Sequence, residues 1–131
     1  VVDEAYVDFA DQNCIDLLRR NERILVTRTL SKSYALAGIR FGYLVAQPHI
    51  IAELAKIKDS YNCDMISIAA ATAAMNCADW LADIREKMIA TRERMATRLA
   101  GMGFHVTPSQ ANFVWCVMPG VDQRAIYEHC K

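Results

Sequence analysis

Two hydroxyl side chains and a lysine lie close together near residue 30. The stretch reads TLSK and contains Thr29, Ser31 and Lys32. In an extended segment, residues two apart face the same side, so both hydroxyls can donate hydrogen bonds to one anion, most naturally a phosphate. The sequence therefore predicts a phosphate-binding segment with an amine beside it.

An arginine eight residues later can complete this segment if the chain turns back. On a continuous helix Arg40 would lie ~12 Å beyond Lys32 along the axis, so we expect a turn, and Gly38 is the residue that tolerates one. A planar guanidinium binds phosphate through two parallel hydrogen bonds. An amine beside such a site indicates a Schiff-base lysine that holds a phosphorylated aldehyde cofactor.

A carboxylate near the start of the chain fits the same cofactor. Asp3 follows two valines, so we expect it at the carboxyl edge of a strand, where α/β sheets bind ligands. Pyridoxal phosphate requires a carboxylate that keeps its ring nitrogen protonated. Tyr6 lies three residues further on and could hydrogen-bond the phenolic oxygen of that cofactor.

The composition is that of an ordinary globular protein. Of the 131 residues, 53% are hydrophobic and 23% charged, and 15 basic residues balance 15 acidic ones. This balance gives no electrostatic reason to expect nucleic acid or an anionic membrane as a partner. No apolar run approaches the ~20 residues of a membrane-spanning helix, and no signal peptide is recognised, so we expect a cytoplasmic protein.

The cysteines and histidines predict neither disulfides nor a metal site. The five cysteines are scattered and never form a CxxC pair, which indicates free thiols in a reducing cytoplasm. The three histidines lack the spacing of a metal pair, so we expect no zinc. The chain opens with VVDEAYVDF and closes with IYEHCK, inside an apparent strand and helix, which predicts a fragment.

The first part of the chain alternates apolar strands with helices. We expect strands at residues 1–3, 23–28 and 39–46, a short helix at 14–20, and a second helix that begins at Pro48. Strands with continuous apolar character, separated by helical segments, indicate an α/β sheet covered on both faces.

The second part has a different pattern. A helix of small residues begins near residue 67, and Asp79 is a candidate N-cap for a long helix that runs to about Ala100, before Gly101 and Gly103. Two alternating strands follow around a turn at 108–111, and a helix spans 122–130. We expect residues 1–75 to belong to a large α/β domain, and residues 76–131 to supply a linking helix and the start of a small α+β domain.

The motifs DEAYVDF and TRTLSKSYALAGIRFGYLVA together resemble the pyridoxal-phosphate-dependent aminotransferases of the aspartate aminotransferase fold. Within that class the chain is most similar to the histidinol-phosphate aminotransferase family, and KDSYNCD and SQANFVW add to this similarity. The resemblance covers nearly the whole chain. It implies a three-layer α/β/α cofactor-binding domain joined by a long helix to a small α+β domain.

The resemblance also implies a role for each candidate residue. Lys32 would bind the cofactor covalently and later move a proton at the substrate carbon. Asp3 would pair with the ring nitrogen and Tyr6 with the phenolic oxygen. The phosphate would be held by the two hydroxyls and the guanidinium: Thr29, Ser31 and Arg40.

Three further residues are weaker candidates for substrate contacts. Tyr61 and Asn62 fit either a turn before the next helix or a substrate or dimer contact, and Asn112 lies at a family position near the site. The family's upstream half and its carboxylate-binding arginine lie outside these residues. We therefore expect the 131-residue chain alone to be inactive.

Three functions remain open from the sequence. The first is transamination between L-histidinol phosphate and 2-oxoglutarate in histidine biosynthesis, by an enzyme that the resemblance implies is a homodimer. The second keeps the cofactor but changes the reaction, as in an aromatic amino-acid aminotransferase or a threonine-phosphate decarboxylase. The third is a non-catalytic domain that binds a phosphate-containing ligand or a partner chain.

Overall fold

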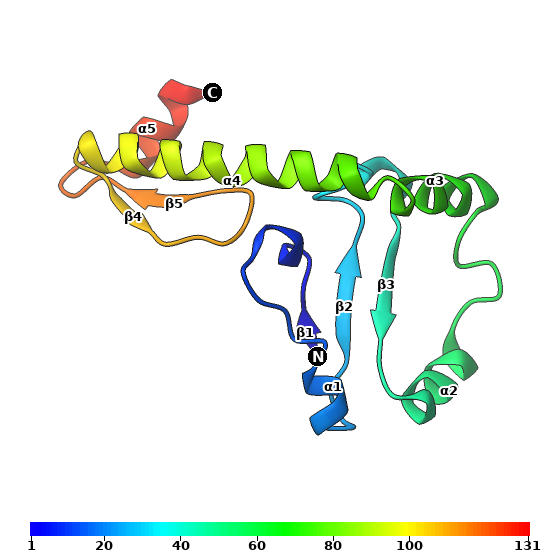
Figure 1. Ribbon diagram of the computed structural model, residues 1–131. Helices are drawn as coiled ribbons and strands as arrows, with labels where there is room; N and C mark the ends of the chain where they lie inside the picture. The colour runs from blue at the N-terminus through cyan, green and yellow to red at the C-terminus, as the bar shows by residue number, and fades with distance from the viewer.

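The first sheet contains three short strands. The computed structural model describes all 131 residues, and its strands are β1 (Val2–Asp3), β2 (Val26–Thr29) and β3 (Gly42–Val45). They lie in the order β1-β2-β3, with β1 parallel and β3 antiparallel to β2 (Figure 1). All three expected strands are present, but β2 begins and ends later than predicted, and β3 is shorter.

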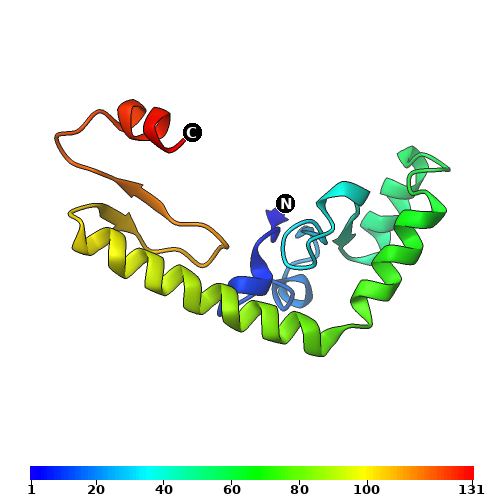
Figure 2. The same cartoon turned by 90° about the horizontal axis from the view of Figure 1, so that it is seen from above.

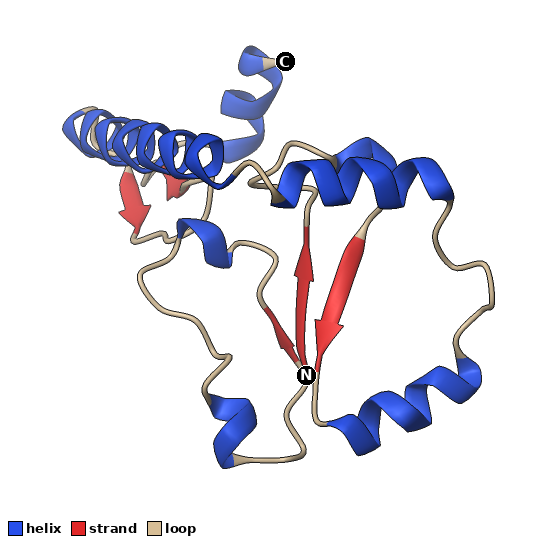
Figure 3. Cartoon of the chain, turned by 45° about the vertical axis from the view of Figure 1, so that its right-hand side comes forward, coloured by secondary structure: helices blue, strands red, loops and turns tan.

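Helices connect and flank these strands. They are α1 (Leu17–Arg20), α2 (Pro48–Ile57), α3 (Met65–Met75), α4 (Ala78–Gly101) and α5 (Gln123–Cys130), with short 3-10 helices η1 (Val7–Phe9) and η2 (Ala37–Ile39). Figure 3 shows α3 and α4 near the end of the sheet to which β2 points, while α1 and α2 lie at the opposite end. The first sheet is thus enclosed at both ends by helices.

The long helix α4 connects the first sheet to a second one. Its 24 residues span roughly 36 Å, and the antiparallel strands β4 (His105–Thr107) and β5 (Trp115–Val117) lie along its far end with α5 (Figure 2). Gly103 follows with a φ of +93°, a conformation that glycine adopts without strain, and so ends the helix as predicted.

The expected N-cap of α4 is wrong. The helix begins at Ala78 after Cys77, whose side chain makes no capping hydrogen bond, and Asp79 lies inside the first turn. There its negative charge interacts favourably with the positive end of the helix dipole, but Asp79 is not the N-cap. The two aspartates that do cap helices are Asp64, which accepts from the Ser67 amide, and Asp122, which accepts from the Arg124 amide.

The core of the chain is small. Eight of the 131 residues are buried, and Phe9, Val26 and Leu30 are the largest with almost no exposure. These three come from η1, the first position of β2 and the loop after β2, so the core extends along β2 from its start to its end. Large apolar side chains on α3, such as Met65 and Ile66, stay about four-fifths exposed.

No single helix is both long enough and apolar enough to cross a membrane. The pair α3 and α4 meets those criteria only in combination, across a bend of 76°.

Candidate active site

The candidate residues lie at the carboxyl edge of the parallel pair β1 and β2. Asp3 is the last residue of β1 and pairs with Thr27 of β2, two residues before Thr29 at the end of that strand. Because the two strands are parallel, the segments that leave them begin at the same edge. Ligands bind at this edge in α/β sheets.

The loop after β2 folds back, so that its last residues lie beside its first ones. The Leu30 amide donates to the Phe41 carbonyl at 3.2 Å, and the Leu36 amide donates to the Leu30 carbonyl at 3.1 Å. Ser67 Oγ of α3 lies 3.1 Å from the Ile39 carbonyl oxygen, so the start of α3 packs against the end of the loop. The predicted return of the chain is therefore confirmed, and it brings the backbone of residues 40 and 41 beside the end of β2.

The turn does not depend on Gly38, contrary to expectation. The residues with left-handed backbone conformation are Ala35, with φ of 55°, and Arg40, with φ of 52°. Gly38 lies within η2, and a Cβ there would meet nothing within 4 Å. The strain is carried by two residues with side chains, which the closing backbone hydrogen bonds hold in place.

Lys32 presents its amine without an acidic partner. Its side chain is exposed, forms no ion pair, and lies with Nζ 5.2 Å from the centre of the Tyr6 ring, within cation–π range. The next residue is anchored, since Ser33 is 3% exposed and its hydroxyl donates a hydrogen bond to the Asp8 carboxylate. A free amine on a fixed backbone suits a nucleophile.

The two hydroxyls lie side by side, as predicted, but only one is available. Thr29 Oγ1 is 2.9 Å from Ser31 Oγ and 3.2 Å from the Phe41 carbonyl, and it accepts the Ser31 amide at 3.1 Å. Because a hydroxyl has one proton, Thr29 uses it within the loop. The Ser31 hydroxyl accepts from Thr29 and retains its own proton for an anion.

Arg40 does not reach this hydroxyl pair. Its Nη1 donates to the Ala37 carbonyl at 2.9 Å within its own turn, and its side chain is exposed. The other guanidinium N–H groups have no protein partner. Arg40 thus lies close to the site in the sequence, but its guanidinium does not contact the two hydroxyls of the predicted phosphate-binding segment.

Asp3 and Tyr6 also keep unused hydrogen-bonding groups. One carboxylate oxygen of Asp3 accepts the Ala5 amide at 3.0 Å, and its other oxygen has no partner. The Tyr6 hydroxyl forms no hydrogen bond in the structure, although its ring contacts Lys32 and Phe113. A carboxylate, a phenol and an amine with spare capacity at one sheet edge fit a ring with a basic nitrogen, a phenolic oxygen and an aldehyde.

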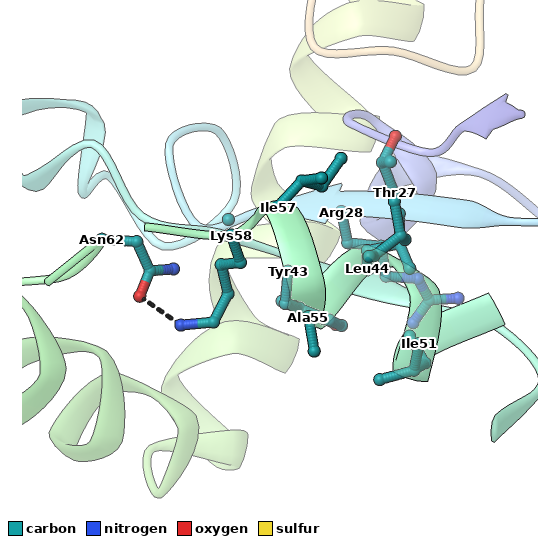
Figure 4. A pocket seen from close by; sticks show the side chains of 11 residues that line it. Thr27, Arg28, Tyr43, Leu44, Ile51, Ala55, Ile57, Lys58 and Asn62 are labelled. Carbon is teal, nitrogen blue, oxygen red and sulfur yellow. Dashed lines mark hydrogen bonds between the residues drawn. The ribbon is translucent and has the colours of Figure 1, made fainter. Parts of the chain in front are cut away.

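The three weaker candidates lie elsewhere. Tyr61 is 92% exposed, and Asn62 accepts a hydrogen bond from Lys58 Nζ at 2.9 Å beside a cavity of about 710 Å³ between β3 and α2 (Figure 4). Asn112 lines a cavity of about 130 Å³ against α4. Lys32 lines neither cavity, and no hydrogen bond joins it to any of the three candidates.

Sequence reasoning missed a buried ion pair below the site. Arg28 Nη2 lies 2.7 Å from Glu4 Oε2, with the two side chains 22% and 5% exposed, and Glu4 also accepts the Cys14 amide. Burial lowers the pKa of Arg28, but hydrogen bonds to Glu4 and Tyr43 outweigh it and raise the pKa above its usual value. A signal was present, because Arg28 lies in a strand that the sequence predicts to be buried, where a charge requires a partner.

A second missed feature is the environment of Tyr34. Burial, together with the negative charge of Asp8, raises the pKa of the Tyr34 phenol above its ordinary 10.0. Tyr34 follows Ser33, which also contacts Asp8. Asp8 therefore influences two consecutive residues after Lys32, which sequence spacing alone does not reveal.

Comparison with known proteins assigns the family. The model for aminotransferase class I and II matches residues 1–129. A histidinol-phosphate aminotransferase of Rhodopirellula baltica is 66% identical over all 131 residues, which cover 36% of its length. One from Geobacter sulfurreducens is 46% identical over 98% of the chain and 37% of its own length.

A solved structure has the same arrangement of elements. The histidinol-phosphate aminotransferase of Sinorhizobium meliloti, in complex with pyridoxal-5'-phosphate, superimposes with a TM-score of 0.77 and 32% identity, over 86% of this chain and 31% of that one. The chain spans about a third of the length of these relatives. It belongs to the family of class I and II aminotransferases.

Proposed function

We propose that this chain forms the part of a pyridoxal-phosphate site that contains the reactive lysine, in an aminotransferase. The observation that supports this most directly is the unpaired Lys32 amine over the Tyr6 ring, at the edge where Asp3 and Ser31 also have free hydrogen-bonding groups. The solved relative that binds pyridoxal-5'-phosphate adds to the case. When bound, the cofactor ring withdraws electrons from the substrate carbon so that a proton can leave it.

Each residue of the chain has a task in this proposal. Lys32 would hold the cofactor through its amine, and the same amine, once free, would take and return the proton at the substrate carbon. Asp3 keeps the ring nitrogen protonated, and Tyr6 donates to the phenolic oxygen. Ser31 and Arg40 bind the phosphate, while Thr29 keeps Ser31 in position. Arg40 reaches the phosphate by exchanging its hydrogen bond to Ala37 for one to the anion.

We further propose the division of the chain and its setting. Residues 1–75 form part of the large cofactor-binding domain, and residues 76–131 form the linking helix and the start of the small domain. The five cysteines are scattered and odd in number, with no CxxC pair, a pattern that supports a reducing cytoplasm. The intact enzyme is proposed to be a homodimer.

The proposed substrates are L-histidinol phosphate and 2-oxoglutarate. This choice rests on relatives, since those with 66% and 46% identity are histidinol-phosphate aminotransferases. The groups around Lys32 bind the cofactor and do not distinguish one amine substrate from another. Tyr61, Asn62 and Asn112 are proposed to approach the substrate only in the complete protein.

The test uses the complete gene product that carries these residues, loaded with pyridoxal phosphate. Histidinol phosphate, phenylalanine and threonine phosphate are compared as amine substrates with 2-oxoglutarate as acceptor. We expect the highest kcat/KM for histidinol phosphate, and a Lys32→Ala loss of roughly 10²-fold or more, because general acid–base catalysis contributes that much. Faster reaction of phenylalanine, or release of CO₂ from threonine phosphate, would replace this substrate assignment.

A further inference from the structure

The loop between β4 and β5 packs against the segment that carries Tyr6. The Gln110 side chain donates to the Asp11 carboxylate at 2.9 Å, and its oxygen accepts the Asp11 amide at 3.1 Å. These two reciprocal hydrogen bonds join residues almost a hundred positions apart. The second sheet therefore has a fixed contact beside the candidate site.

An arginine of α4 holds the same two segments together. Arg92 Nη1 donates to the Phe9 carbonyl at 3.3 Å and to the Ala111 carbonyl at 3.0 Å. Arg85 on the same helix donates to the Asp8 carbonyl at 2.7 Å and the Ala10 carbonyl at 3.2 Å. Both segments are thus fixed to one rigid helix, and their separation is fixed with it.

The backbone of Phe113 is set by a local turn. The Ser109 hydroxyl donates to the Phe113 carbonyl at 2.6 Å and accepts the Ala111 amide at 3.1 Å. From this position the Phe113 ring meets the Tyr6 ring with 5.3 Å between centroids and 80° between planes, the edge-to-face arrangement that aromatic pairs favour. Lys32 Nζ lies 5.2 Å from the centre of the same Tyr6 ring.

From these contacts we propose that Phe113 is a positioning residue that holds the Tyr6 ring in place beside the Lys32 amine. This inference rests on the proposed function, in which Tyr6 donates to the cofactor's phenolic oxygen. The Tyr6 hydroxyl has no protein partner that would orient it. Its direction therefore depends on packing of the ring, and Phe113 is the aromatic side chain that packs on it.

Phe113 acts on the cofactor only through Tyr6, and this gives a specific signature. A hydrogen bond to the phenolic oxygen stabilises the oxygen's anionic form, and so lowers the pH at which the lysine-bound cofactor loses its proton. Loss of the Phe113 ring lets the Tyr6 hydroxyl move, and that pH should rise by about half a unit. A residue that only stabilises the fold would not shift this midpoint.

The experiment measures the pH midpoint of the visible absorbance band in the complete, cofactor-loaded protein. Four variants are compared: Phe113→Ala, Phe113→Leu, Phe113→Tyr and, as a matched exposed aromatic two residues along, Trp115→Ala. We expect the midpoint to shift upward in Phe113→Ala and in Phe113→Leu. The leucine variant keeps much of the apolar volume, so it serves as the test if the alanine variant does not fold. Phe113→Tyr and Trp115→Ala should keep the wild-type midpoint.

A double-mutant cycle completes the test. In a Tyr6→Phe background the hydroxyl is absent, so Phe113→Ala should add no further shift. An unchanged midpoint in Phe113→Ala, or an equal shift in the Tyr6→Phe background, overturns the role of Phe113 while leaving that of Lys32 intact. A wild-type protein without any visible band overturns the proposed function and, with it, this inference.

Discussion

Glu4 and Arg28 form a buried ion pair that connects the end of β1 to the middle of β2. The Glu4 carboxylate receives Arg28 Nε at 2.8 Å and Nη2 at 2.7 Å, and the carboxylate is 5% exposed. Both guanidinium nitrogens contact the same oxygen, Glu4 Oε2, and a charge-assisted pair with so little solvent access fixes the two strands that lead to Asp3 and Lys32. The candidate site depends on this pair without containing it.

Removal of Glu4 should therefore destabilise the protein strongly. Glu4→Ala leaves the Arg28 charge partly buried without a partner, and we expect a loss of roughly 3 kcal/mol in the free energy of unfolding. Chemical denaturation of the complete protein measures this loss. The control is Glu53→Ala, which breaks an exposed Lys56 pair and should cost about 0.5 kcal/mol or less. Equal losses in both variants would refute the structural role of Glu4.

The start of α3 should respond to acid through Asp64. Hydrogen bonds from the Ser67 hydroxyl and amide hold the pKa of Asp64 below its ordinary 3.8. Because the folded pKa is lowered, the stabilisation is present above pH ~4 and is lost as the pH falls through the folded value. Carbon NMR of the aspartate carboxyls should show a midpoint below 3.8, which Ser67→Ala raises. Ser60→Ala, in the neighbouring loop, should leave that midpoint in place. A low midpoint that persists in Ser67→Ala would contradict the assignment.

Gly42 should resist substitution while Gly38 tolerates it. A Cβ at Gly42 would lie 2.8 Å from the Arg28 carbonyl, whereas one at Gly38 meets nothing within 4 Å. Gly42 pairs with Thr29, so Gly42→Ala forces β3 away from the end of β2. We expect a loss of about 1–3 kcal/mol in stability, and weaker cofactor binding. Thermal melts and cofactor titration check this, with Gly38→Ala close to wild type; the reverse order of the two variants would refute it.

The two hydroxyls should separate into a binding role and a structural role. Ser31→Ala removes a free donor, so the Kd for pyridoxal phosphate should rise about tenfold, and stability should change little because Thr29 can donate to the Phe41 carbonyl instead. Thr29→Val removes the oxygen that accepts the Ser31 amide and the proton that Thr29 donates within the loop, and should also cost about 1 kcal/mol of stability. Equilibrium dialysis and denaturation on both variants distinguish the roles. Identical effects of the two substitutions would show that the hydroxyls act as one unit.

The elements of this fold were largely predictable, because they depend on local pattern. Pro48 opens α2, Asp122 caps α5, and Gly103 ends α4 as their residue types indicate. Asp79 shows the limit of such patterns, since acidic residues favour both the cap and the first turn of a helix, and only the backbone decides between them.

The contacts of the site were less predictable, because they join distant segments. The left-handed conformations fall on Ala35 and Arg40 rather than on Gly38, since closure of the loop by tertiary hydrogen bonds overrides local preference. The Phe113 contact with Tyr6 depends on how α4 brings the second sheet to the first. Lys32 itself could be identified from the sequence, because the hydroxyl residues that mark it, Thr29 and Ser31, lie within three positions of it.

The identity of the reactive lysine is the central claim, and covalent trapping tests it most directly. The complete protein is loaded with pyridoxal phosphate, reduced with borohydride, digested and mapped by mass spectrometry. The account predicts a pyridoxyl group on the peptide that contains Lys32, and its loss in Lys32→Ala. A pyridoxyl group at Lys56, Lys58 or Lys87 instead, or a wild-type protein that traps none, would contradict the account.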